Sequence, residues 1–268
     1  STAGLFLKTN NDWEETAYRL LAKNFGFKIN AQPFEELARA VPFKIIKKHA
    51  TSLLQIEALL FGQAGFLETC TTNYQQELEY EYRFLEHKYN LKRGNKEVSI
   101  WKFGRIRPAN FPTLRIAQLS ALLAATPNLF SVLIEQTNFK SLEKLLNSSP
   151  SESWETHYHF VDMEASHVAR IGTSSKEIID INTVVPLMVA YGKYLGQQEI
   201  VDRAIGLLES MRSEDNKITR LFSNLGRSAA SAFDSQAQLE LYNEFCSRKM
   251  CLSCAIGNEL IKTERLYS

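Results

Sequence analysis

The stretch LLQIEALLF, residues 53–61, is apolar on nearly every side, with Gln55 and Glu57 as its polar members. A helix on a protein surface pairs an apolar face with a polar one, whereas a helix that is apolar all round is enclosed by its neighbours. The stretch therefore predicts a central helix around which other helices pack.

Helical patterns continue on both sides of this stretch. Glycine and proline together make up about 7% of the 268 residues, where roughly 12% is usual. Few turn-forming residues favour long helices, and apolar spacing predicts them over residues 74–89, 112–125, 184–195, 198–210, 235–248 and 251–263. We expect an all-α, multi-helix assembly.

Residues 147–180 have the weakest helical pattern, because polar clusters alternate there with aromatic and β-branched residues. We expect an irregular connector that holds a short hairpin or extended strand. The chain is expected to form a single helical domain over residues 1–268. A subdivision into helical parts 1–146 and 181–268 stays open.

The composition excludes several classes of protein. The net charge is +1, so no global field attracts nucleic acid or membrane, and such binding requires a local patch. The longest apolar run, residues 116–125, is too short and too polar to cross a bilayer. No signal peptide pattern opens the chain, and four cysteines do not form a disulfide framework. We expect a cytoplasmic protein with no membrane partner.

Five phrases of the sequence carry a family resemblance. They are WEETAYRLLAKNFGFKINAQPFEELAR (13–39), QIEALLFGQAGFL (55–67), RIRPANFPTLRIAQL (105–119), INTVVPLMVAYG (181–192) and CLSCAIGNELIK (251–262). Together they resemble the bacterial family of domain of unknown function 2851. The resemblance implies an upstream region with a nuclease-type set of carboxylates and a lysine, which nothing in this chain matches. We expect the chain to be the C-terminal, helical part of a longer protein.

The clearest local excess of charge lies between residues 88 and 115. This stretch contains one acidic residue, Glu97, and eight basic residues. The basic residues are Lys88, Lys92, Arg93, Lys96, Lys102, Arg105, Arg107 and Arg115. With Asn110 as a helix cap, the last three arginines would gather at a helix N-terminus, where the dipole disfavours cations by up to roughly 1 kcal/mol each. Such an arrangement requires an anion.

Two kinds of anion fit this requirement. One is an external phosphate, with Trp101, Phe103 and Phe111 placed to stack on the bases of a single strand. The other is internal, because Glu57 needs a partner if it is buried, and Glu81 and Glu86 are further carboxylates. An ion pair is the expected role of Glu57, and a catalytic carboxylate is its alternative.

A second cluster lies near the C-terminus, where Cys246, Cys251 and Cys254 are spaced as C-x4-C-x2-C. A helix N-terminus favours the thiolate, so zinc or an iron–sulfur cluster could bind there. Cys70, His157 and His159 are the candidates for a fourth ligand. The alternatives are three cysteines that pack as small apolar groups, or a reactive thiol.

These patterns lead to a ranked set of functions. We expect a non-catalytic helical module of a larger nucleic-acid-acting protein, which contacts phosphate through Arg105, Arg107, Asn110 and Arg115. The alternative is a structural or protein-interaction module whose arginines are paired internally. A third reading is an enzyme for a small anionic metabolite, with Glu57 and the arginines in one pocket.

Overall fold

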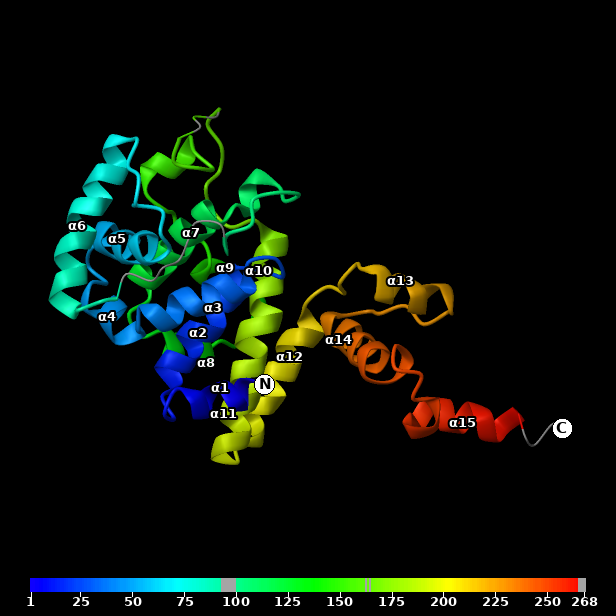
Figure 1. Cartoon of the computed structure of the whole chain (residues 1–268). Helices are drawn as coiled ribbons and strands as arrows, with labels where there is room; N and C mark the ends of the chain where they lie inside the picture. The colour runs from blue at the N-terminus through cyan, green and yellow to red at the C-terminus, as the bar shows by residue number, and fades with distance from the viewer. Residues whose placement is uncertain (93–99, 162, 164, 265–268) are drawn as a thin grey trace. The chain divides into compact units, whose positions relative to one another are not determined.

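The computed structural model describes residues 1–92, 100–161, 163 and 165–264, and it confirms the all-α prediction. Helices joined by loops make up the described residues, and no strand occurs among them (Figure 1). The chain divides into two compact units, Ser1–Val201 and Asp202–Ser268. None of the described helices has the length and apolar character that a membrane crossing requires.

The first unit begins with helices of two to four turns and a longer α6. They are α1 (Thr2–Lys8), α2 (Trp13–Phe25), α3 (Ala31–Ala40), α4 (Phe43–Lys48), α5 (Leu53–Gln63) and α6 (Asn73–Tyr89). After the basic segment come η2 (Pro108–Asn110), α7 (Pro112–Ala125), α8 (Leu129–Ile134), α9 (Phe139–Leu145), η3 (Glu152–Glu155), α10 (Thr173–Ile179), η4 (Asp180–Val184) and α11 (Val185–Leu195).

Helix α5 is enclosed by its neighbours, as its composition predicts. Leu59, Leu60 and Phe61 have no exposed surface, and burial of each such side chain contributes about 1.5–3 kcal/mol. Helices α6 and α7 pack against α5. The approach of α6 requires Gly62, because a Cβ there would overlap the ring of Tyr82.

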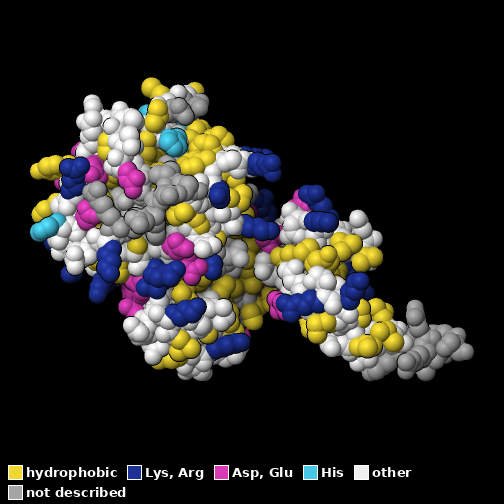
Figure 2. Space-filling view, viewed as in Figure 1, with side chains coloured by type: hydrophobic (Ala, Val, Ile, Leu, Met, Phe, Trp, Pro, Cys, Tyr) yellow, Lys and Arg dark blue, Asp and Glu magenta, His cyan; other side chains and the backbone are white. Residues whose placement is uncertain are grey.

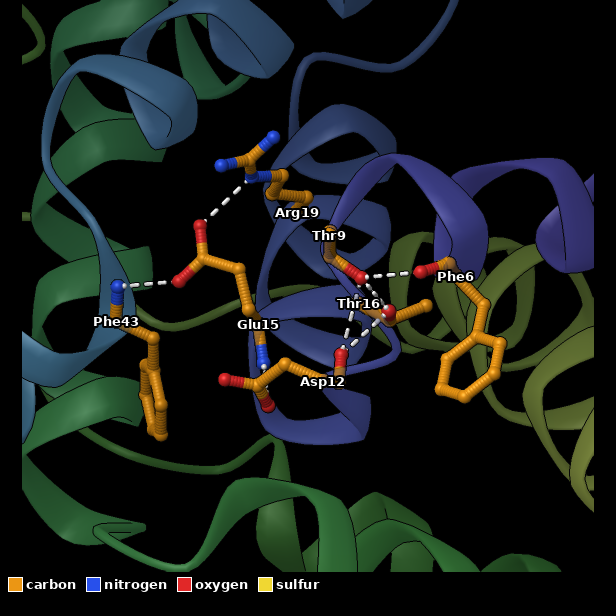
Figure 3. A network of polar contacts seen from close by, with 7 residues as sticks. All are labelled: Phe6, Thr9, Asp12, Glu15, Thr16, Arg19 and Phe43. Atoms are coloured by element: carbon orange, nitrogen blue, oxygen red, sulfur yellow. Dashed lines mark hydrogen bonds and ion pairs between the residues drawn. The ribbon is translucent and has the colours of Figure 1, made fainter.

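A network of polar contacts joins α1, α2 and α4 (Figure 3). The side chain of Asp12 caps α2 by accepting a hydrogen bond from the Glu15 backbone N–H at 3.1 Å. Glu15 is itself buried: one carboxylate oxygen lies 2.7 Å from Arg19 Nε, and the other accepts from the Phe43 backbone N–H at 2.7 Å. Because this N–H opens α4, the Glu15 carboxylate fixes the start of α4 against α2.

The segment 147–180 differs from the expected connector in its second half. Its first half contains η3 and one isolated bridge between His157 and Met163, in place of a hairpin. Helix α10 then begins at Thr173 and runs through the π-turn η4 into α11. The helical segment therefore begins about three turns before the predicted residue 184. Pro186 breaks a regular helix, because it lacks an N–H and its ring collides with the carbonyl four residues before it. The wider π-turn ahead of Pro186 accommodates this loss.

The second unit contains shorter elements. They are the larger part of α12 (Gln198–Ser210), α13 (Lys217–Asn224), α14 (Ala232–Leu241), η5 (Tyr242–Cys246), η6 (Cys251–Ser253) and α15 (Ala255–Glu264). Figure 2 shows hydrophobic side chains on its visible face, and the exposed apolar residues of this unit include Leu221, Leu225, Leu252, Ile256 and Leu260. A small unit buries a smaller share of its surface, so some apolar exposure is expected.

Candidate functional site

The basic segment before α7 is fixed to the core at two points. The Trp101 side chain is buried, and its indole N–H donates to the Ala64 carbonyl at 2.9 Å. The Asn30 side chain holds the backbone of Lys102 on both sides, accepting from its N–H at 2.9 Å and donating to its carbonyl at 3.0 Å. The chain that follows therefore leaves the core from a fixed position.

We call residues 102–110 the arginine turn. Arg105 and Arg107 are exposed, and Arg105 has a positive φ of 62°, which turns the chain sharply at that residue. Neither guanidinium has a carboxylate partner among the residues that the structure describes. Lys102 is also exposed, whereas Arg93, Lys96 and Glu97 of the predicted basic cluster lie outside the described residues.

Asn110 does not cap α7, contrary to the sequence prediction. The helix begins at Pro112 with Phe111 in the capping position, and no side chain accepts from its first N–H groups. The Asn110 side-chain oxygen instead accepts a hydrogen bond from Arg115. Because Pro112 already lacks an N–H, the first turn has one donor fewer to satisfy.

Arg115 is buried and lies in a pocket of neutral groups. It donates to the side-chain oxygens of Gln118 and Ser175, each at 2.9 Å, in addition to Asn110. Its guanidinium lies 4.5 Å from the centre of the Phe27 ring. Burial lowers the pKa of Arg115 to about 10, so the side chain still carries a charge at neutral pH. No carboxylate pairs with it in the described part of the chain.

Aromatic side chains flank the arginine turn. The half-buried rings of Phe103 and Phe111 meet edge to face at 5.2 Å, and His159 lies 5.2 Å from Phe103. Trp101 differs from the prediction, since its ring packs in the core against Phe34 and is not available for stacking. Phe103 and Phe111 thus remain as the aromatic surface beside the exposed arginines.

Glu57 is buried, but its partners are hydroxyl groups and not an arginine. Tyr74 donates to one carboxylate oxygen at 2.7 Å, and Ser151 donates to the other at 3.2 Å. Burial raises the pKa of Glu57 to about 7, and the bonds from Tyr74 and Ser151 partly offset that rise. Glu57 therefore forms neither the ion pair nor the shared pocket with arginines that its sequence context suggested, among the residues that the structure describes.

The three C-terminal cysteines lie on different elements of the second unit. Cys246 ends η5, Cys251 begins η6, and Cys254 precedes α15, so Cys251 and Cys254 do not share the face of one helix. Cys246 and Cys251 are exposed, and Cys254 is buried. Cys70, His157 and His159 belong to the first unit. No group of three or more His, Cys, Asp or Glu side chains within the described ranges is arranged to hold a metal ion, and the zinc or iron–sulfur site stays a prediction.

Sequence patterns missed the residues that position these groups. Asn30 occupies the N-cap position of α3, yet its side chain holds Lys102, which is 72 residues away in the chain. No sequence pattern connects Ser151 and Tyr74 with Glu57, because the three residues meet only where η3 packs on α5 and α6. Long-range contacts of this kind leave no local pattern.

These features define an all-α protein whose first unit presents an arginine turn on its surface. A comparison with protein families matches residues 3–217 to the family described as "Protein of unknown function (DUF2851)", and the chain belongs to this family. The matched range covers the first unit except for its first two residues, and it extends into the start of the second unit. Comparisons with curated proteins and with solved structures gave no match.

Proposed function

We propose that the first unit binds the phosphate backbone of nucleic acid through the arginine turn, as a non-catalytic module of a larger protein. The observation that carries the proposal is the state of Arg105 and Arg107, which are exposed and lack a carboxylate partner within the described residues. Arginine forks match phosphate oxygens in geometry, and unpaired exposed arginines are free to meet them.

Arg115 has a different role in this proposal from the one that its sequence position suggested. It is too deeply buried to meet a phosphate group, and its hydrogen bond to Asn110 holds the end of the arginine turn against α7. Neutral acceptors and an aromatic ring stabilise its charge, and no carboxylate among the described residues cancels the positive potential that it adds near the turn.

Phe103 and Phe111 favour a single-stranded ligand. A base that leaves the helical stack can lie on an exposed aromatic ring, and each such contact is worth about 1–3 kcal/mol. Both rings are half-buried and lie beside Arg105 and Arg107 in the chain. A double-stranded ligand would use the arginines but not these rings.

The test is the binding of labelled single-stranded and double-stranded oligonucleotides to the full chain over a range of salt concentrations. We expect binding that weakens as salt rises, because phosphate contacts release counterions. The variants Arg105→Ala and Arg107→Ala should each weaken binding and reduce the slope of log K against log salt by roughly 0.7–0.9. Phe103→Leu should weaken only the single-stranded ligand.

The matched control is Arg83→Ala, which removes the same charge from an exposed position on α6 where Arg83 pairs with Glu79 at 2.7 Å. Equal losses for Arg83→Ala and Arg107→Ala would mean that net charge and not the arginine turn attracts the oligonucleotide. No binding at low salt by a folded chain would refute the proposal and favour a protein-interaction module.

A further inference from the structure

A small cavity lies between the start of α6 and η3, away from the arginine turn in the chain. Its volume is about 60 Å³, and the described residues that line it are Thr72, Tyr74, Ser153, Trp154, His157 and Phe160. One water needs about 10–15 Å³ by this measure, so the cavity has room for a group of four or five heavy atoms.

Three aromatic rings form neighbouring walls of this cavity. The Trp154 ring meets the Phe160 ring at 63° with centres 5.2 Å apart, and it meets the Tyr74 ring at 77° with centres 6.4 Å apart. Tyr74 and Phe160 are inclined by 41°. A cation that meets the face of an aromatic ring is attracted by the negative charge of its π system, so a space lined by three rings is suited to a cation.

A buried carboxylate lies next to these walls. Tyr74 lines the cavity and also donates to Glu57, whose side chain is almost wholly buried. Glu57 has no cationic partner among the described residues, since its bonds come from Tyr74 and Ser151. A buried carboxylate without a counter-charge is costly in its ionised form, and a cation bound nearby would stabilise it.

We propose that this cavity binds the methylated ammonium group of a small organic cation. The aromatic walls would contact the methyl groups and the charge, and the Glu57 carboxylate would supply the counter-charge through its position behind Tyr74. No lysine or arginine appears among the described lining residues, so no fixed cation competes for the space. The site is independent of the arginine turn and of nucleic acid.

The proposal predicts a specific dependence on pH. Burial raises the pKa of Glu57 to about 7, so the carboxylate changes from mostly protonated at pH 6 to mostly ionised at pH 8. Affinity for a cation should therefore rise by up to about tenfold across this range. Two other titratable groups line the cavity, namely His157 and Tyr74, and burial raises the pKa of Tyr74 so that it stays neutral.

The experiment compares choline with 3,3-dimethylbutan-1-ol, its neutral analogue of the same shape, by calorimetric titration of the full chain at pH 6 and pH 8. We expect choline to bind at least tenfold more tightly than the neutral analogue at pH 8, and Glu57→Gln to remove most of that preference.

Two controls keep the outcome clear. Tyr74→Phe retains the ring and removes the bond that lowers the Glu57 pKa, so choline should still bind and the rise in affinity should move to higher pH. Circular dichroism establishes that each variant is folded. Equal binding of choline and its neutral analogue, binding of choline that is unchanged in Glu57→Gln, or no binding of either compound would each overturn the proposal.

Discussion

The substitution Gly62→Ala tests whether α5 and α6 pack as closely as the structure indicates. In an open helix this change stabilises by about 1 kcal/mol, because alanine is the better helix former. At residue 62 the new Cβ would lie 2.5 Å from Cε2 of Tyr82 and closer still to Cδ2 and Cγ. Tyr82 is buried, and its hydroxyl oxygen accepts a bond from Gln63 at 2.8 Å, so the ring has little freedom to move.

The two effects oppose each other, and their magnitudes decide the sign. Forcing extra volume into a packed core costs about 1–3 kcal/mol, and displacing the Tyr82 ring also strains its bond to Gln63. After the gain in helix propensity, we expect a net loss of about 1–2 kcal/mol. For a unit of this size, such a loss corresponds to a fall in melting temperature of roughly 2–8 °C.

The assay uses tryptophan fluorescence during thermal unfolding, since Trp13, Trp101 and Trp154 all belong to the first unit. The matched control is Gly4→Ala in α1, where a Cβ meets its nearest neighbour at an ordinary 3.5 Å. That variant should be neutral or more stable. An unchanged or higher melting temperature for Gly62→Ala would show that α6 can move away from α5 at little cost, and the close packing would be refuted.

Three further predictions follow from the described contacts. The side-chain carboxylate of Asp180 is buried with no hydrogen-bond partner in the described chain, and burial raises its pKa to about 8. The folded state therefore holds the proton more tightly than the unfolded state, so stability should fall as the pH rises from 5 to 8, and the stability of Asp180→Asn, measured by urea unfolding, should depend less on pH. Glu15→Gln weakens the charge-assisted bond to the Phe43 N–H and the ion pair with Arg19, so the free energy of unfolding should fall by about 1–2 kcal/mol. An unchanged urea midpoint would contradict the role of Glu15 at α4. In the native protein, the exposed Cys246 and Cys251 should react with a thiol reagent faster than buried Cys254, and peptide mapping of the labelled protein would measure this difference. Labelling that stays slow until a chelator is added would instead support the predicted metal site.

The fold class was predictable from sequence because it depends on local periodicity. Residues 53–61 are apolar all round, and α5 is enclosed as that pattern requires. The start of α10 was not predictable in the same way, because the polar residues that follow Gly172 resemble a loop until tertiary packing buries Ile179 and Lys176. Tertiary contacts override a weak local preference of this kind.

The candidate site was predictable only in part, for a related reason. A run of arginines identifies a basic segment, but it does not say which guanidiniums face the solvent. Arg107 and Arg115 look alike in sequence, yet one is exposed and the other is held among Asn110, Gln118 and Ser175. That distinction depends on α10 packing beside α7, which brings together residues 60 positions apart.

The π-turn η4 has one residue more than a regular helical turn, and this residue sets the rotation of α10 relative to α11 about the helix axis. Deleting a single residue within Asp180–Val184 would remove the extra residue of the π-turn and rotate one helix about its axis by about 100° relative to the other. Ser175 would then turn away from Arg115, and Lys176 from its bond to Asn147. The extra residue therefore fixes the rotation at which the later half of the first unit packs against α7, the helix that follows the arginine turn.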